Sequence, residues 1–344
     1  MTKMWKEILE QPKVLEGCLD KADAMRPLAD RIRSSDIRFV VIAARGTSDH
    51  AAIYGKYIIE HELGIPVSLA APSIITSYGS KMDYRNCVVI AISQSGQAMD
   101  VLEVINQARE NGALTIGITN DQNSPVALKS EYHLFTDAGE EKSVAATKTF
   151  TAQMMTLAIL TALWKNEKSL LEALEKIPYN LKNVFALESD INKIIDDFND
   201  MDLCFILARG FNYPIALEAA LKIQETCYIE AKGYATSDFY HGPIAMIEKN
   251  TPVIIFAPCG PVYTDVMDMY KKVKDLGAKT ILVTSDTGIL EKNSLSFIIP
   301  AAANDMISAF YIAVFSQMFA CRLSISKKLD PDKPRTLNKI TITR

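Results

Sequence analysis

The sequence predicts an α/β protein made of two tandem, doubly wound parallel-sheet subdomains that are related by internal duplication. Three observations support this prediction. Similar segments recur at a constant spacing, short β-branched runs occur in both halves of the chain, and each run is followed by a turn and a helix-like pattern of about 10 to 15 residues.

The duplication is visible in three pairs of segments that follow one another in the same order. In one pair, 111–121 and 276–286, six of the eleven positions are identical at an offset of 165. The other pairs align 39–46 with 203–210 and 87–93 with 252–258, at offsets of 164 and 165. Continuous apolar runs of this length are typical of strands buried on both faces of a parallel sheet.

This pattern defines the domain organisation that we expect. A helical arm occupies residues 1–35, the first subdomain 36–165, a helical linker 166–200, the second subdomain 201–322, and a tail that covers the active site 323–344.

Composition excludes several classes of protein. The chain has 344 residues, 49% hydrophobic and 23% charged, so it can bury a core and is not a disordered protein. Its net charge of −4 argues against a nucleic-acid partner. The most apolar helical stretch, Ala309–Leu323, is shorter than a bilayer requires, so we expect a buried core helix and no membrane partner.

The cysteines and the N-terminus indicate the compartment. None of the six cysteines forms a Cys-x-x-Cys pair, and several lie inside apolar runs. We therefore expect a reduced, cytoplasmic protein with neither a disulfide framework nor a structural zinc ion. The first residues lack the apolar stretch of a signal peptide.

Hydroxyl-rich loops follow the predicted strands of the first half. They are Arg45–Ser48, Ser93–Gly96 and Ser143–Lys148, and each opens a predicted helix. Hydroxyls and free N–H groups at a helix start form a site for an anion, most naturally a phosphate. Ordinary N-capping explains any single loop equally well. However, the matching turns of the second half lack serine and threonine, and this difference favours a ligand site.

The second half carries charges on a helix that is otherwise apolar. Pro214–Glu225 reads as a helix with proline in its first turn, and Glu218, Lys222 and Glu225 share one face. A surface Glu–Lys pair is the alternative, and it would stabilise the helix very little. Because the surroundings are apolar, charges here are costly unless they are used or well paired, so we favour a role in proton transfer.

His241 and Lys339 complete the candidate residues. His241 lies in a predicted loop between a helix and a strand, where a structural histidine is the alternative reading. The tail is basic and contains two prolines, which is typical of a solvated segment, but its apolar residues favour an anchored tail that brings Lys339 over the site. No metal-ligand spacing, Walker motif or dinucleotide motif is present, so we expect no metal and no cofactor.

Seven segments together resemble the SIS (sugar isomerase) family over nearly the full chain. Their resemblance is greatest to the isomerase half of glutamine–fructose-6-phosphate aminotransferases and to stand-alone glucosamine-6-phosphate deaminases of that family. The segments are Met4–Pro12, Gly46–Ser48, Ser93–Gly96, Val144–Lys148, Pro214–Glu225, His241–Pro243 and Pro334–Lys339. This resemblance implies two flavodoxin-like subdomains, a phosphosugar substrate and a homodimer with shared active sites.

The resemblance also implies a role for each matched residue. Glu225 would move a proton between C1 and C2, Lys222 would assist it, and His241 would open the sugar ring in the neighbouring subunit's site. Lys339 would form or stabilise an imine at C2. The phosphate and sugar hydroxyls would be bound by Gly46, Thr47, Ser48, Ser93, Gln94, Ser95, Ala98 and Val144.

Departures from the synthase pattern set the expected reaction. The sequence has no N-terminal glutaminase domain, Ala98 lacks a phosphate-binding hydroxyl, and Ala146 and Asp238 replace serine and glutamate. We therefore expect a deaminase/isomerase that converts a hexosamine 6-phosphate to fructose 6-phosphate and ammonia. The alternatives are a fructosamine-phosphate deglycase, another phosphosugar isomerase and a non-catalytic phosphosugar-binding regulator.

Overall fold

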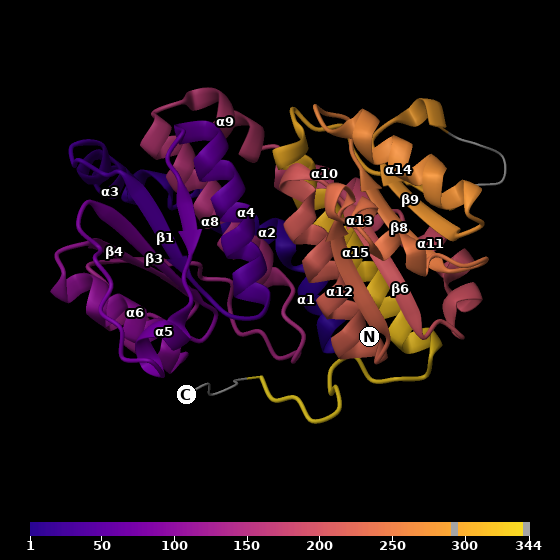
Figure 1. Cartoon of the computed structure of the whole chain (residues 1–344), viewed down its shortest axis with the longest axis horizontal. Helices are drawn as coiled ribbons and strands as arrows, with labels where there is room; N and C mark the ends of the chain where they lie inside the picture. Colours follow the sequence, from indigo (N-terminus) through magenta and orange to yellow (C-terminus); the bar gives the residue numbers. More distant parts are fainter. Residues whose placement is uncertain (290–294, 340–344) are drawn as a thin grey trace. The chain divides into compact units, whose positions relative to one another are not determined.

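The computed structural model describes residues 1–289 and 295–339 and contains two compact units, each built on one sheet (Figure 1). The N-terminal unit contains residues 10–142, 148–176 and the segment that begins at Thr336. The C-terminal unit contains residues 1–9, 143–147 and 177–335. The last part of the predicted tail, residues 340–344, lies outside the described residues.

Both sheets have five parallel strands in equivalent order. In the N-terminal unit the order is β2-β1-β3-β4-β5, and in the C-terminal unit it is β7-β6-β8-β9-β10. This flavodoxin-like order, repeated in both units, confirms the predicted fold class. The strands are β1 Phe39–Ala43, β2 Val67–Leu69, β3 Cys87–Ser93, β4 Leu114–Thr119, β5 Tyr132–Phe135, β6 Leu203–Ala208, β7 Glu230–Ala235, β8 Pro252–Ala257, β9 Lys279–Thr284 and β10 Leu295–Ile298.

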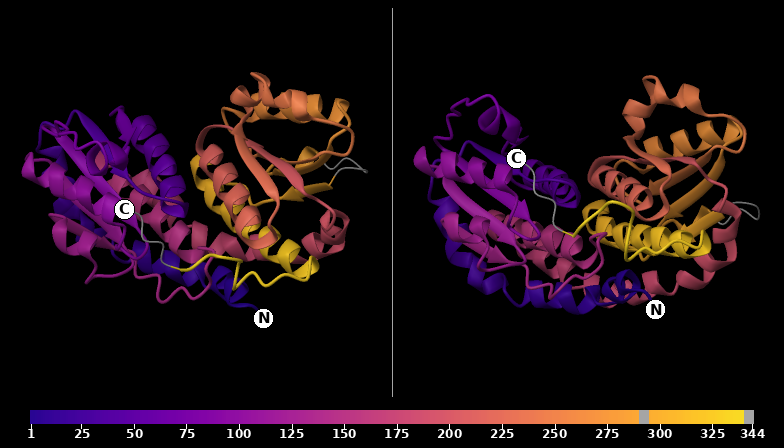
Figure 2. Two further views of the ribbon diagram at one scale, coloured as in Figure 1. Left: turned by 60° about the horizontal axis from the view of Figure 1, so that its bottom comes forward. Right: turned by 90° about the horizontal axis from the view of Figure 1, so that it is seen from below.

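Helices cover both faces of the sheet in the N-terminal unit (Figures 1 and 2). Alternate strand residues such as Val41 and Val89 pack on α5 and α6, while Gly55 of α4 lies against Ile42 of β1 and Leu157 of α8. The helices of this unit are α2 Gln11–Leu19, α3 Ala22–Arg33, α4 Thr47–Leu63, α5 Pro72–Thr76, α6 Met99–Glu110, α7 Pro125–Lys129, α8 Lys148–Lys165 and α9 Lys168–Leu174.

The C-terminal unit repeats this arrangement. Phe205 and Ile255 pack on α14, and α12 packs against β6, β7 and α15. At Gly233 of β7 an added Cβ would lie only 2.7 Å from the carbonyl oxygen of Ala216, so α12 can approach the sheet only where a glycine stands. The helices are α1 Lys3–Leu9, α10 Ile177–Phe185, α11 Glu188–Ile194, α12 Tyr213–Cys227, α13 Thr236–Tyr240, α14 Tyr263–Asp275 and α15 Asp305–Ser326.

Helix α15 corrects one sequence-based prediction. With 22 residues and a mean hydropathy of 1.5 in its most apolar window, it is long enough to cross a bilayer, so the prediction that this stretch is too short was wrong. The predicted stretch, Ala309–Leu323, omitted both ends of the helix, which runs from Asp305 to Ser326 and includes the polar residues Ser316 and Gln317. Both are buried, and 94% of that window is buried inside the protein, so the predicted core helix is confirmed.

Candidate functional site

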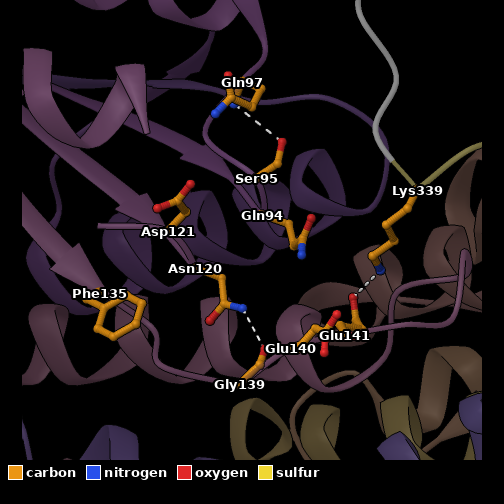
Figure 3. Close-up of a pocket in the computed structure, with 10 residues that line it drawn as sticks. All are labelled: Gln94, Ser95, Gln97, Asn120, Asp121, Phe135, Gly139, Glu140, Glu141 and Lys339. Atoms are coloured by element: carbon orange, nitrogen blue, oxygen red, sulfur yellow. Dashed lines mark hydrogen bonds and ion pairs between the residues drawn. The ribbon is translucent and has the colours of Figure 1, made fainter. Parts of the chain in front are cut away.

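A cavity of about 480 Å³ opens at the carboxyl ends of β3, β4 and β5 in the N-terminal unit (Figure 3). This is the edge where ligands bind in open parallel sheets. The residues that line it come from the loops after those three strands and from the tail. They are Gln94, Ser95, Gln97, Asn120, Asp121, Phe135, Gly139, Glu140, Glu141 and Lys339.

The loop after β3 places its polar groups beside this cavity. The Ser93 hydroxyl oxygen accepts the N–H of Gly96 at 3.0 Å, and the Ser95 hydroxyl oxygen accepts the N–H of Gln97 at 3.3 Å. Gly96 has φ +63°, and an added Cβ would lie 2.0 Å from Ser124 Oγ, so only glycine allows this turn. Gln94 and Ser95 line the cavity, whereas Ser93 lies behind them and is buried.

The strand order reverses between β1 and β3. The loop after β1 lies on one side of this point, and the loop after β3 lies on the other. Gly46 has φ +56°, and α4 begins immediately after it at Thr47. Ser48 is buried, and its hydroxyl oxygen accepts a hydrogen bond of 3.0 Å from the side-chain amide of Gln153 on α8. The Ser48 hydroxyl hydrogen is therefore available to another acceptor.

Two further predicted binding residues are Ala98 and Val144, and both lie in segments that precede helices. Ala98 is the N-cap of α6, and its own side chain has no group that can cap that helix. Val144 is half-buried in the 143–147 segment, which belongs to the C-terminal unit. In that segment the N–H of Ser143 donates to both carboxylate oxygens of Glu7, at 3.3 and 3.2 Å.

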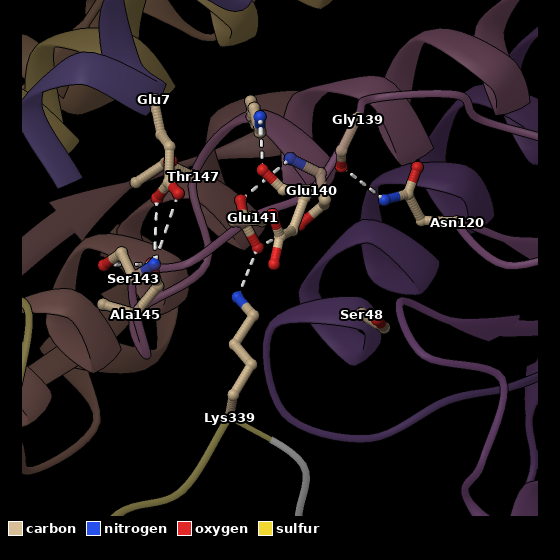
Figure 4. A network of polar contacts seen from close by, with 12 residues as sticks. Glu7, Ser48, Asn120, Gly139, Glu140, Glu141, Ser143, Ala145, Thr147 and Lys339 are labelled. Atoms are coloured by element: carbon tan, nitrogen blue, oxygen red, sulfur yellow. Dashed lines mark hydrogen bonds and ion pairs between the residues drawn. The ribbon is translucent and has the colours of Figure 1, made fainter. Parts of the chain in front are cut away.

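Lys339 brings a cation into the cavity of the N-terminal unit. Its Nζ lies 2.6 Å from Oε2 of Glu141, and Figure 4 shows the side chain pointing at that carboxylate. The loop that carries Glu141 is also fixed at Gly139, because the Asn120 side-chain amide donates to the Gly139 carbonyl at 2.8 Å. The cavity thus combines amide and hydroxyl groups with one amine, that of Lys339, and with the carboxylates of Asp121, Glu140 and Glu141.

The three predicted charges of the second half do share one face of α12. Lys222 Nζ lies 3.3 Å from Glu218 Oε1 and 2.5 Å from Glu225 Oε2. The side chains of Lys222 and Glu218 are almost fully buried, while that of Glu225 is 20% exposed. Burial by itself lowers the pKa of Lys222, but the two carboxylates outweigh it and raise that pKa above its ordinary value.

These distances give the α12 residues distinct chemical capacities. Lys222 is a buried cation between two carboxylates, and Glu225 is the member of the group that reaches solvent. A carboxylate that is exposed on one side and held by a buried ammonium can accept a proton from a bound molecule. His241 lies elsewhere in this unit, exposed at the C-terminal end of α13.

Sequence reasoning missed several residues of the cavity. Asn120 and Asp121 follow β4, and the rule that was applied to β1 and β3 would have found them. Glu140 and Glu141 precede the 143–148 loop without any motif of their own. Within residues 1–289 and 295–339, no group of three or more His, Cys, Asp or Glu side chains is arranged to hold a metal ion.

Comparison with known proteins identifies relatives over both units. The family model of the SIS domain matches residues 35–163 and 199–327, so the resemblance drawn from the motifs is confirmed. The isomerizing glutamine–fructose-6-phosphate aminotransferase of Aquifex aeolicus (strain VF5) is 36% identical over 353 residues. That alignment covers 99% of this chain but 57% of the relative, so the chain spans little more than half of that enzyme's length.

Solved structures share the fold. The C-terminal domain of glucosamine-fructose-6-phosphate aminotransferase from Francisella tularensis has a TM-score of 0.89 and 28% identity, with 97% of this chain and 98% of that domain covered. Glucosamine-6-phosphate deaminase from Thermotoga maritima has a TM-score of 0.82 over 99% of this chain and 100% of the deaminase. Its identity of 22% shows a common fold.

Proposed function

The chain belongs to the SIS domain family and is related to phosphosugar isomerases, and on that premise we propose that it is an amino-sugar-phosphate deaminase/isomerase. Its substrate is a hexosamine 6-phosphate, with glucosamine 6-phosphate as the first candidate. The products are fructose 6-phosphate and ammonia, and one water molecule is consumed.

The proposed reaction has three steps that balance in atoms and protons. His241 promotes ring opening, which exposes the C1 aldehyde of a sugar with an amine at C2. Glu225 takes the proton from C2 and returns one to C1, while a proton passes from the amine nitrogen to the C1 oxygen. The C2 amine thereby becomes an imine and C1 an alcohol, and the buried Lys222 holds Glu225 in place. Water then adds to the C2 imine and ammonia leaves, which produces the ketone.

Lys339 and the loop after β3 have separate roles in this proposal. Gln94 and Ser95, with Ser48, Ser93, Gly46 and Thr47 around the start of α4, bind the phosphate and sugar hydroxyls. The amine of Lys339 forms an imine with a C2 carbonyl, with loss of water, and so stabilises the same carbon in the reverse direction. Val144 and Ala98 border the sugar without donating from their side chains.

The strongest support for the proposal is the position of Lys339 in the cavity. Lys339 lies in one cavity with the amide and hydroxyl groups of Gln94 and Ser95, although these residues are more than two hundred positions apart in the sequence. An amine beside anion-binding groups is the combination required to hold a sugar phosphate and react with its carbonyl.

The proposal includes the assembly and the compartment. We infer a homodimer in which His241 of one subunit serves the site of the other, because His241 is exposed in its own unit. We place the enzyme in the cytoplasm. In support, all six cysteines are free thiols, and burial raises the pKa of Cys18, Cys204 and Cys227 to about 12, so they remain unreactive.

The test is a substrate panel with two independent readouts. Purified full-length protein is incubated with glucosamine, galactosamine and mannosamine 6-phosphates and with a phosphorylated fructosamine. Fructose 6-phosphate is measured by a coupled assay and ammonia by NMR. Equal amounts of both products from one hexosamine 6-phosphate support the proposal.

The other outcomes identify the competing functions. Turnover of the fructosamine phosphate alone indicates a deglycase. Saturable binding of sugar phosphates without turnover of any of them indicates a regulator. Either result rejects the deaminase proposal.

A further inference from the structure

The carboxylate of Glu141 stands out in the wall of the N-terminal cavity because it is fully buried and makes contacts with two distant elements. Its side chain has 0% exposure, although it lines a cavity that is open to solvent. It accepts the backbone N–H of Thr149 at 3.2 Å and the Thr149 hydroxyl at 2.8 Å. Its third partner is Lys339, whose Nζ lies 2.6 Å away.

These contacts hold the Glu141 carboxylate in one orientation. Thr149 is the second residue of α8, so its N–H is one of the helix-start donors that have no partner within the helix. A carboxylate at this end of a helix is stabilised by the helix dipole, and the Thr149 hydroxyl adds a second donor. Glu141 is therefore attached to α8 independently of Lys339.

The position of the Lys339 side chain depends on Glu141, whereas Glu141 has other contacts that hold it in position. The lysine is 24% exposed and lies in the tail segment that begins at Thr336, whereas Glu141 is held by α8. The Glu141–Lys339 pair joins residues 198 positions apart. An ion pair with one rigid, buried member restricts the other member to a small volume, and most surface pairs lack this property.

We propose that Glu141 is a positioning residue that holds the Lys339 amine at the cavity beside Gln94 and Ser95. This inference rests on the proposed function, because positioning matters only if the amine of Lys339 meets a sugar carbonyl. Helix α8 acts through Glu141 as the fixed support of the tail. The alternative is that the pair only stabilises the fold.

Three variants separate these two explanations. Glu141→Gln keeps the side-chain volume and can still accept from Thr149, but it removes the charge that attracts Lys339. Thr149→Val removes one hydrogen bond to Glu141 and leaves the ion pair. Glu60→Gln is the matched control, because the Glu60–Lys56 pair has the same 2.6 Å separation in the same unit and lies outside the cavity.

The main readout is reductive trapping. Each protein is incubated with fructose 6-phosphate and sodium borohydride, and mass spectrometry measures the sugar attached to Lys339. We expect trapping and kcat/KM to fall about 10- to 100-fold in Glu141→Gln, which is the usual cost of a misplaced reacting group. Thr149→Val should show a smaller decrease, and Glu60→Gln should match the unmodified protein. Thermal unfolding of each variant reports stability separately.

A second readout requires no sugar. Labelling of Lys339 with an amine-reactive reagent should be slow in the unmodified protein and several-fold faster in Glu141→Gln, with no change in Glu60→Gln.

The outcomes distinguish this inference from the proposed function. If the unmodified protein traps sugar and Glu141→Gln traps it equally well, the inference is wrong while the proposed function stands. Reduced stability with unchanged trapping leads to the same conclusion. If the unmodified protein neither traps nor turns over any sugar phosphate, the proposed function fails and the inference fails with it. Should Glu141→Gln not fold, Thr149→Val decides by the same trapping criterion.

Discussion

The two units have the same strand order, yet the helix that follows their first strand differs in chemistry. Helix α4 of the N-terminal unit has Tyr54 and Ile58 fully buried. At the repeat offset of 164, the corresponding residues of α12 are Glu218 and Lys222, which are also buried. Apolar residues satisfy this position in one copy, so the fold does not require charges there. The charges in the other copy need a different explanation, and function is the simplest.

The loops at the carboxyl ends of the strands also differ between the two units. In the C-terminal unit they contact one another: the N–H of Cys259 donates to Ser285 Oγ at 2.9 Å, and the Tyr263 hydroxyl donates to Asp286 at 2.6 Å. In the N-terminal unit the corresponding loops also contact one another, since the N–H of Asn120 donates to the carbonyl of Gln94 at 3.0 Å, but Gln94 and Ser95 in addition line a cavity. The two units thus differ in their polar residues: the N-terminal unit has hydroxyl and amide groups in a cavity, and the C-terminal unit has buried charges on α12.

Replacement of Glu225 by glutamine tests this comparison with the largest expected effect. The variant keeps the shape of the side chain and removes its ability to accept a proton, so kcat should fall by about 10² to 10⁴. The coupled fructose 6-phosphate assay measures this change. Stability should change little, because Glu225 is partly exposed. A full rate in the variant would remove Glu225 from the mechanism.

Replacement of Lys222 by methionine tests whether the buried charges serve stability. Loss of one member of a buried pair should lower the free energy of unfolding by about 3 to 5 kcal/mol, because Glu218 loses its buried cation. The double variant Lys222→Met, Glu218→Met imitates the apolar α4 and should regain most of that stability while it stays inactive. Urea denaturation and the activity assay measure the two properties. Activity in a stable double variant would contradict the functional explanation.

The fold, the hydroxyl-rich loops and the charged face of α12 could be predicted from sequence, because each depends on a pattern of residues that are close together in the chain. The 164–165 offset, the apolar runs and the hydroxyl loops are patterns over a few residues. The face formed by Glu218, Lys222 and Glu225 follows from helical spacing alone. Helix α12, observed at Tyr213–Cys227, confirms the helix predicted from Pro214 onward.

The remainder depends on contacts that no local pattern encodes. Glu141 lies in a stretch without a motif, and its partners Thr149 and Lys339 are 8 and 198 positions away. The exchange of segments between the units, with 143–147 in one and the segment from Thr336 in the other, likewise has no sequence signature. Asn120 could have been predicted, because it directly follows a strand, as the identified residues do.

Replacement of Ser95 by alanine compares the loops of the two units. Loss of one hydroxyl that donates to a phosphate should raise KM for the phosphorylated substrate about tenfold, as expected for a hydrogen bond to a charged group. The matched control is Ser285→Ala, which removes a loop hydroxyl from the C-terminal unit and should leave KM unchanged. Steady-state kinetics measure both. Equal KM values in the two variants would show that the loop after β3 does not contact the phosphate.

Replacement of Ala98 by threonine tests whether an added hydroxyl at the start of α6 stabilises the N-terminal unit or strengthens phosphate binding. Ala98 is the N-cap of α6 with an extended backbone, ψ 105°, and its own side chain has no group that can cap the helix. A threonine hydroxyl there should accept a helix-start N–H and stabilise the N-terminal unit by about 0.5 to 2 kcal/mol. If the phosphate also lies at this helix start, KM for the sugar phosphate should fall several-fold while binding of the unphosphorylated sugar stays constant. A gain in stability without a change in KM would separate capping from ligand binding and place the phosphate away from α6.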